Sequence, residues 1–316
     1  MLILQELLGV LIVKNSVMNV FNKLNVLWMA IFGYCYKWMV DLGVLSVPNL
    51  NNSSCDIVVS LTSYGRRVSD GVVYYTLVSV LRQTLQPSRI LLWLSEDEWN
   101  DDTLPSKLQY LRKKGVEIRY CKDTRSYKKL IPTLSLYPNC NIMTIDDDII
   151  YTKDSINVIW NQHLQNKKSI ICLKASMPKL EDGVPSNYAK WNEYQTPVNG
   201  LMVFPIGCGG TLYPQGSLHE DVLREDLFLR LCPLADDIWF WFCGLLNETE
   251  KLYIKKSSTD LSFDALYQYF HKGSALTHTN RFEHANDSQF KDLLNFYNIK
   301  LIDSGEIIKN GILGGN

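Results

Sequence analysis

Short apolar runs alternate with segments of helical periodicity between residues 55 and 175. Compact runs rich in apolar residues predict strands at 57–61, 90–94, 116–120, 142–145 and 170–173. Apolar residues spaced three or four apart predict helices at 73–81, 104–115, 130–136 and 156–164. This alternation is typical of βαβ units, so we expect an α/β fold with a mainly parallel sheet flanked by helices.

The stretch NIMTIDDDIIY, Asn141–Tyr151, ends an apolar run in three consecutive carboxylates, Asp146, Asp147 and Asp148. Acids buried without partners are costly, so this strand end needs water or a cation. Ligands of open α/β sheets bind just beyond the carboxyl ends of the strands. Carboxylates at that place suit Mg²⁺ or Mn²⁺, which also grips substrate phosphates. The stretch therefore predicts a metal–nucleotide site; the alternative is a solvated turn in which an Asp caps the next helix.

Two further polar segments are expected at the same edge of the sheet. Thr62–Arg67 follows the first predicted strand, and Ser95–Asp97 follows the second. Right-handed crossovers bring the ends of parallel strands to one edge, which would place these segments near the acids. No G-x-G-x-x-G follows the first strand and no G-x-x-x-x-G-K-[ST] occurs. A dinucleotide-binding fold is therefore disfavoured and a P-loop is excluded.

Glycines gather beyond residue 175, at Gly207, Gly209 and Gly210, and Thr211 follows them. A loop of this kind lets the backbone approach a ligand closely. The alternative is an ordinary glycine-rich turn.

A second acidic pair, Asp236 and Asp237, stands between strongly apolar flanks. Acids in such surroundings must cap a helix, find a partner or serve a function. The segment by itself leaves a helix cap and a general base both open.

The composition is that of an ordinary folded protein, with 46% apolar and 21% charged residues among 316. The net charge of −1 gives no indication of nucleic-acid binding. The eight cysteines form no C-x-x-C pair, and most lie in apolar runs, where Cys behaves as a small hydrophobe. We therefore expect reduced thiols in a cytoplasmic protein.

The first fifty residues differ from the rest. Their longest uncharged stretch, Leu24–Tyr36, has 13 residues, whereas a membrane-spanning helix needs about 20. Apolar residues from Leu27 to Cys35 recur at helical spacing. They predict an amphipathic helix on a membrane surface or a helix packed on the main domain or a second subunit. We divide the chain into an N-terminal apolar helical segment, a main α/β domain and a C-terminal helical extension, at 1–50, 51–260 and 261–316.

Four stretches, in this order, resemble the family 2-like bacterial glycosyltransferases of the GT-A fold, which use nucleotide sugars. They are IVVSLTSYGRR, TLVSVLRQTLQPSRILLWL, TIDDDIIY and ADDIWF, within roughly residues 55–245. The first two are similar to the family's first strand with its donor loop and to its first helix with the second strand. The last two resemble its metal-binding D-x-D and the acidic pair that supplies the catalytic base.

The resemblance implies an inverting, metal-dependent transfer. Mn²⁺ or Mg²⁺ would bridge the donor diphosphate, with Asp148 as a ligand and Asp146 sharing the metal or contacting the ribose. Asp147 alternates away from that face in extended geometry and is the weakest nucleotide contact of the three. A carboxylate would deprotonate the acceptor hydroxyl. Asp237 matches the family's base best, with Asp236 as the alternative.

Further donor-site residues follow from the same resemblance. The loop along the nucleoside would contain Thr62, Ser63, Tyr64 and Arg66. Lys128 and Lys129 precede the D-x-D and would pair with diphosphate oxygens as point charges. Relatives have V-D-D-G-S where this chain has WLSEDEW, so Glu96 or Asp97 would take the place of the acid that contacts the nucleobase.

The resemblance also implies an acceptor side. Gly209, Gly210 and Thr211 resemble the family's acceptor loop, and His278 and Asn280 would close over the donor. This chain has Asp-Asp where relatives have Glu-Asp in the acidic pair.

Together these features predict a glycosyltransferase that moves a sugar from a nucleotide-diphosphate sugar, by family habit a UDP-linked one. The acceptor would be a glycan or lipid-linked glycan of a bacterial surface polysaccharide such as O-antigen or capsule. The enzyme would act in the cytoplasm, with peripheral contact at the inner face of the plasma membrane. The alternatives are a nucleotidyltransferase and a catalytically inactive module that binds a sugar or nucleotide.

Overall fold

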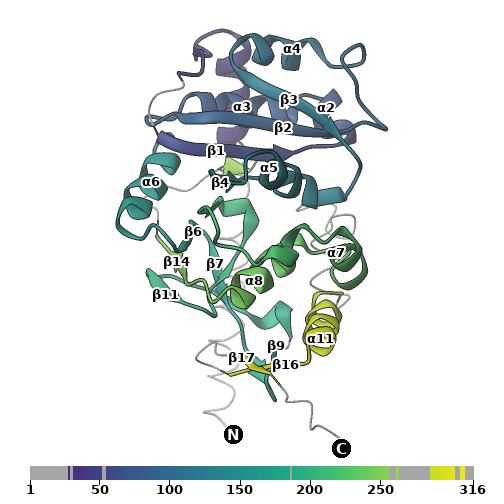
Figure 1. Cartoon of the computed structure of the whole chain (residues 1–316). Helices are drawn as coiled ribbons and strands as arrows, with labels where there is room; N and C mark the ends of the chain where they lie inside the picture. The colour runs from purple at the N-terminus through teal and green to yellow at the C-terminus, as the bar shows by residue number, and fades with distance from the viewer. Residues whose placement is uncertain are drawn as a thin grey trace, which may run out of the picture.

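The computed structural model describes residues 28, 31–51, 55–185, 187–255, 261–262, 285–302 and 307–309. Its centre is an eight-stranded sheet in the order β11-β14-β6-β13-β4-β1-β2-β3 (Figure 1). These strands are β1 (Cys55–Thr62), β2 (Pro87–Ser95), β3 (Val116–Cys121), β4 (Asn141–Thr144), β6 (Ile170–Cys172), β11 (Val198–Gly200), β13 (Thr211–Tyr213) and β14 (Lys251–Tyr253). Strands β1 to β4 are parallel, as are β6 and β14. Strand β13 runs antiparallel to β4 and β6, and β11 runs antiparallel to β14. The predicted α/β fold with a mainly parallel sheet is confirmed.

Helices cover both faces of this sheet. They are α2 (Gly65–Ser69), α3 (Val72–Leu81), α4 (Ser106–Lys113), α5 (Ile131–Leu136), α6 (Ser155–Gln165), α7 (Glu225–Leu231), α8 (Asp236–Leu246) and α11 (Ala285–Tyr297). Successive side chains of a strand point to opposite faces. Val59 and Leu61 therefore join the core formed with α3, α4 and α6, while Val58 joins the aromatic core around α8. Helices α7, α8 and α11 gather beside the lower half of the sheet in Figure 1.

Shorter elements complete the molecule. The 3₁₀ helices are η1 (Arg125–Lys129), η2 (Tyr188–Lys190), η3 (Gly207–Gly209) and η4 (Glu220–Leu223). The remaining strands are β5 (Ile149–Ile150), β7 (Ala175–Met177), β8 (Leu180–Glu181), β9 (Val184–Pro185), β10 (Asn192–Glu193), β12 (Phe204–Pro205), β15 (Leu261–Ser262), β16 (Ile299–Leu301) and β17 (Ile307–Lys309). In its described residues the C-terminal segment holds helix α11, the pair of β16 and β17, and β15, which pairs with β5; its sequence did not predict these strands.

Every predicted strand and helix between residues 55 and 175 is present, with one local difference. The turn expected at Thr62–Arg67 contains the start of helix α2. At Gly115 the backbone takes a φ of +102°, and a Cβ there would lie 2.8 Å from Leu50 Cβ. Glycine is therefore required for the chain to leave α4 and enter β3.

The N-terminal segment contains a helix over residues 31–41. Val40 is buried against the main domain, and the Asp41 carboxylate accepts hydrogen bonds from Tyr75 (2.7 Å) and Lys107 (2.8 Å). The opposite face exposes Trp28, Phe32 and Trp38. Within the described part of the chain, no helix has the length and apolar character needed to cross a membrane.

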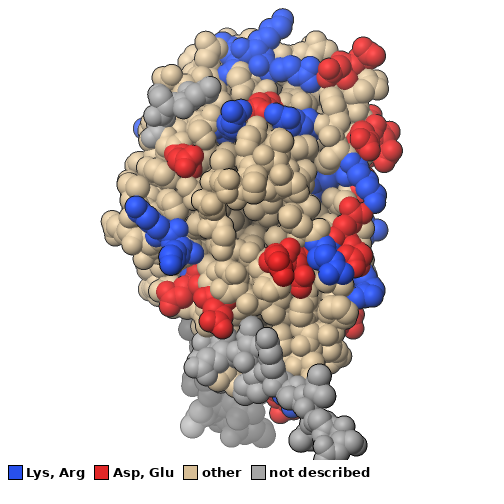
Figure 2. Space-filling view, in the orientation of Figure 1, with Lys and Arg blue, Asp and Glu red and all other residues tan. Residues whose placement is uncertain are grey.

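Acidic and basic side chains are intermixed around the face shown in Figure 2, and its centre is largely uncharged.

Candidate active site

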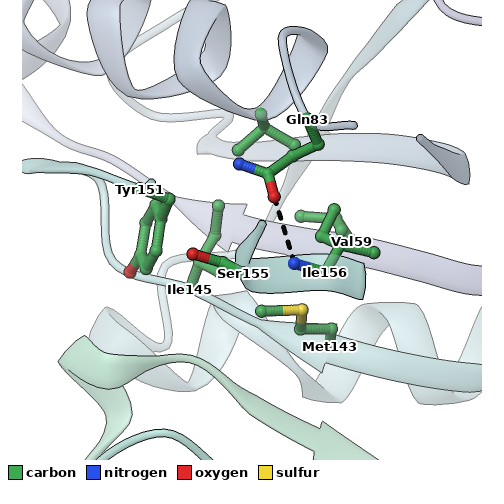
Figure 3. Close-up of a pocket in the computed structure, with 8 residues that line it drawn as sticks. Val59, Gln83, Met143, Ile145, Tyr151, Ser155 and Ile156 are labelled. Atoms are coloured by element: carbon green, nitrogen blue, oxygen red, sulfur yellow. Dashed lines mark hydrogen bonds between the residues drawn. The ribbon is translucent and has the colours of Figure 1, made fainter. Parts of the chain in front are cut away.

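The three consecutive acids lie beyond the carboxyl end of β4, as expected for a ligand site of an open α/β sheet. The side chains of Asp147 and Asp148 are buried, with 5% and 8% of their surface exposed, whereas Asp146 keeps 33% exposed. Figure 3 shows the small cavity beneath this turn, where Met143, Ile145 and Tyr151 form part of the lining. The turn therefore rests on the core and presents Asp146 outward.

Arg67, from the first turn of α2, forms ion pairs with both buried acids. Its guanidinium lies 2.5 Å from Asp147 Oδ1 and 3.0 Å from Asp148 Oδ2. The Ser63 hydroxyl donates to Asp147 Oδ2 at 2.6 Å, and Thr76 Oγ1 donates to the Asp147 carbonyl at 2.9 Å. Burial raises the pKa of Asp147, while Arg67 and Ser63 act against that rise. The acidic turn is thus fastened to β1, α2 and α3.

The rest of the segment Thr62–Arg67 lies at the same edge. Tyr64 is half exposed, and the Arg67 guanidinium stands 5.6 Å from its ring centroid. The Thr62 hydroxyl donates to the Trp93 carbonyl of β2 at 2.9 Å. Arg66 points away from the acids, with 90% of its side chain exposed and a 3.3 Å contact to Asp70. Arg67 therefore contacts the acids and Arg66 does not; the expected contact of Arg66 with the donor stays a prediction.

The segment after β2 meets this loop through a residue that sequence reasoning missed. Glu98 Oε2 accepts a 2.9 Å hydrogen bond from the Gly65 amide at the start of α2. Glu96 and Asp97 are exposed beyond the strand end. Their expected contact with a nucleobase stays a prediction.

Lys129, at the end of η1, brings the second acidic pair to the first. Its ammonium lies 2.8 Å from Asp236, 3.4 Å from Asp146 and 3.6 Å from Asp237. Burial by itself lowers the pKa of Lys129, but the three acids together raise it well above its ordinary value. The neighbouring Lys128 pairs instead with Asp123. The lysines expected on the diphosphate are thus both engaged with carboxylates.

Asp237 stands in the first turn of α8 and has the features of a general base. Its Oδ2 accepts a 3.0 Å hydrogen bond from the Gly207 amide, and its side chain is 27% exposed. Burial raises the pKa of Asp237 to about 6, with Asp236 and Asp146 adding to the rise and Lys129 opposing it. A base whose pKa lies near the working pH combines a useful ionised fraction with proton affinity. Helix α8 starts after Ala235, so Asp236 and Asp237 occupy its first turn and neither is the cap residue.

The glycine-rich loop closes over this group of acids. Gly207–Gly209 forms η3, and the Tyr151 hydroxyl joins it to the acidic turn by donating to the Cys208 carbonyl (3.0 Å) and accepting from the Asp146 amide (3.0 Å). A Cβ at Gly209 would lie 2.4 Å from Lys174 Cβ, and Gly210 takes a φ of +92°. These two glycines are therefore required by packing and backbone geometry.

Thr211 does not fit the acceptor role expected from the sequence. It is fully buried in β13, where it pairs with Thr144 of β4. A side chain inside the central sheet cannot reach an acceptor. His278 and Asn280 lie outside the described residues.

The charge balance of the site suits a cation. Two cations, Arg67 and Lys129, face five carboxylates. In the described ranges no three His, Cys, Asp or Glu side chains gather into a metal cage. Mg²⁺ usually needs only one or two carboxylates together with water and substrate phosphates. These carboxylates therefore fit such an ion, and Asp146 has the most exposed side chain of the five.

No protein-family model matches the chain, and no curated protein matches it. The structure is similar to the crystal structure of residues 1 to 349 of S. aureus TarS, with 14% identity, a TM-score of 0.46, and coverage of 77% of this chain and 73% of that one. It is also similar to the structure of the same protein in complex with UDP-GlcNAc, with 14% identity, a TM-score of 0.43, and coverage of 76% of this chain and 67% of that one. A third similar structure is that of 4-diphosphocytidyl-2C-methyl-D-erythritol synthase, with 12% identity, a TM-score of 0.40, and coverage of 67% of this chain and 91% of that one. Likenesses of this size carry no argument about activity, so the site is interpreted from its own residues.

Proposed function

We propose that this protein transfers a sugar from a nucleotide-diphosphate sugar to an acceptor hydroxyl. One observation carries the proposal: the acids after β4 and the acids that begin α8 meet around Lys129, beside the loop after β1. One acidic group borders the predicted donor loop. The other presents a partly exposed carboxylate of raised pKa, which suits the acceptor side.

The reaction is a single displacement. The acceptor oxygen bonds to the anomeric carbon as the bond from that carbon to the diphosphate oxygen breaks, and the acceptor proton passes to Asp237. Asp236 stays paired with Lys129 at 2.8 Å and is less open than Asp237. A single displacement inverts the configuration at the anomeric carbon, as the resemblance implies.

Asp146 and Asp148 would hold a divalent ion at the donor side. Bound Mn²⁺ or Mg²⁺ supplies positive charge to the leaving diphosphate as a Lewis acid. Arg67 keeps Asp147 and Asp148 in place, and Tyr151 orients the backbone at Asp146.

The donor we propose is UDP-linked, and the acceptor is a glycan or lipid-linked glycan of a bacterial surface polysaccharide. The exposed aromatic face of the helix at 31–41 supports peripheral contact with the cytoplasmic leaflet. The specific sugar is to be found by screening.

The first test is thermal unfolding of the purified chain with UDP, GDP, CDP or ADP, each with and without Mn²⁺. A ligand at 100 times its dissociation constant stabilises the native state by about 2.7 kcal/mol. We expect UDP to stabilise only with metal and Asp148→Ala to abolish the effect. Release of UDP from UDP-sugars, and its loss in Asp237→Asn, then tests the transfer.

Asp70→Asn is the matched control, because Asp70 is an exposed acid paired with Arg66 outside the acidic turn. It should keep the full response to UDP and Mn²⁺. A folded protein that responds to no nucleotide would contradict the proposal. A response to a nucleotide without release of UDP from any UDP-sugar would favour the inactive binding module. Exchange of diphosphate into a nucleoside triphosphate would favour a nucleotidyltransferase.

A further inference from the structure

Lys129 is placed among carboxylates, where the sequence led us to expect a contact with phosphate. Only 7% of its side chain is exposed. Its ammonium has three donors, and three acids surround it, namely Asp236, Asp146 and Asp237. The ammonium thus lies within hydrogen-bonding distance of Asp236 and Asp146 and forms a longer ion pair with Asp237, so its charge is directed at carboxylates.

Gly207 closes the same group from the other side. Its amide donates to Asp237 Oδ2, while Asp237 Oδ1 faces the Lys129 ammonium. A Cβ at Gly207 would lie 2.6 Å from Asp237 Oδ1 and 2.8 Å from Lys129 Nζ. The absence of a side chain at residue 207 is therefore a condition for the contact between Asp237 and Lys129.

We propose that Lys129 is a positioning residue that, with the Gly207 amide, holds the Asp237 carboxylate toward the acceptor side and does not bind the donor diphosphate. The inference rests on the proposed function, because it concerns the base of that reaction. A carboxylate has about four lone-pair sites, and these two contacts set its orientation while leaving sites for an acceptor hydroxyl. Lys129 also ties Asp146 to α8, so the donor and acceptor sides share one buried cation.

The test compares Lys129→Met, Lys129→Arg and Gly207→Ala with the wild-type chain. The assays are release of UDP from a saturating UDP-sugar and the affinity for UDP with Mn²⁺. A positioned general base contributes about 10²–10⁴-fold. We expect Lys129→Met and Gly207→Ala to lower kcat by about 10²-fold and to leave the Kd for UDP within about threefold. Lys129→Arg keeps the charge and should recover part of kcat.

Lys251→Met is the matched control, because Lys251 is also a buried lysine but lies in β14 and donates a hydrogen bond to the Leu201 carbonyl. It should keep both kcat and UDP affinity. If Lys129→Met does not fold, Gly207→Ala carries the test, because it keeps every charge and adds one methyl group.

Two outcomes would overturn the inference. One is a Kd for UDP weakened about tenfold or more with kcat unchanged, which would make Lys129 a diphosphate ligand. The other is an unchanged kcat in both Lys129→Met and Gly207→Ala. If the wild-type chain releases UDP from no UDP-sugar, the proposed function fails while the contact can still be tested. The free energies of unfolding of Lys129→Met, Asp237→Asn and the double variant are then compared. The changes caused by the two substitutions should be non-additive, and additive changes would refute the contact.

Discussion

At the acidic edge of the sheet, one guanidinium serves two buried carboxylates. Arg67 contacts Asp147 and Asp148, and both acids are less than one-tenth exposed. A buried charge left without its partner is strongly destabilising. Arg66, next to it in the chain, turns outward to the surface residue Asp70. The position of each arginine within α2 therefore decides whether it supports the site.

We expect Arg67→Met to lower the free energy of unfolding by about 3–5 kcal/mol, because it strands two buried acids. Arg66→Met should change it by no more than about 0.5 kcal/mol, as is usual for exposed positions. Urea unfolding of both variants at neutral pH measures the difference. Equal effects of the two substitutions would show that Arg67 does not neutralise the turn.

Among the elements, helix α8 contributes both to the candidate site and to the hydrophobic core. Its first turn carries Asp236 and Asp237, while the following residues fill the aromatic core. Its Gly244 lies against the Lys251 side chain of β14. A Cβ added at Gly244 would lie 3.1 Å from Lys251 Cε. Lys251 is fully buried and donates to the Leu201 carbonyl at 2.9 Å. Burial lowers the pKa of Lys251 to about 7.

Lys251 should make the stability of this helix–strand contact depend on pH. Its pKa is about 7 when folded, against an ordinary value of 10.5. Between these values the unfolded chain binds more protons, so this residue's contribution to stability rises with pH, by about 1.4 kcal/mol per pH unit. Below pH 7 both states are protonated and the folded protein bears the full cost of the buried charge.

Lys251→Met removes that cost, so it should stabilise the protein most below pH 7. Its advantage over wild type should shrink as the pH rises from 7 towards 10.5. Unfolding of both proteins at several pH values measures this, and the difference cancels other titrating groups. An advantage independent of pH would mean that Lys251 does not carry the proposed proton linkage.

For the whole molecule, one face of the N-terminal helix is packed and the other is open. Val40 and Asp41 attach the helix to α3 and α4, and Trp28, Phe32 and Trp38 are each more than half exposed. The two sequence interpretations of this segment are thus compatible, because they concern opposite faces of one helix. A membrane surface is the occupant we propose for the open face.

We expect the chain to co-sediment with anionic lipid vesicles. The double variant Phe32→Ser, Trp38→Ser should bind at least about tenfold more weakly, because it removes two large apolar side chains. Tyr110→Ser is the control, since Tyr110 is an exposed aromatic on α4. Vesicle binding that is absent in wild type, or equal in all three proteins, would contradict peripheral attachment through this face.

Several parts of the site followed from local pattern. The apolar run before Asp146 predicted a strand that ends in carboxylates. For Asp236 and Asp237 a helix start was one of two open interpretations, and both acids lie in the first turn of α8. Other features depend on contacts between distant segments. The acceptor for the Ile156 amide at the start of α6 is Gln83 Oε1, from just beyond the end of α3 (Figure 3). Arg66 and Arg67 are neighbours in one short helical turn, but their side chains point in different directions and contact different acids. The same holds for Lys128 and Lys129.

The sequence by itself determined the order of strands and helices between residues 55 and 175, the mainly parallel sheet and the edge at which the acids gather. Those features follow from apolar periodicity and the handedness of crossovers, which act within neighbouring segments. Only the tertiary structure decided which cation meets which acid and placed Thr211 inside the sheet. Lys129 lies 107 residues before Asp236 in the chain, and their contact arises because η1 and α8 pack together on one face of the sheet. Such pairings depend on side-chain direction after packing, which no local pattern encodes.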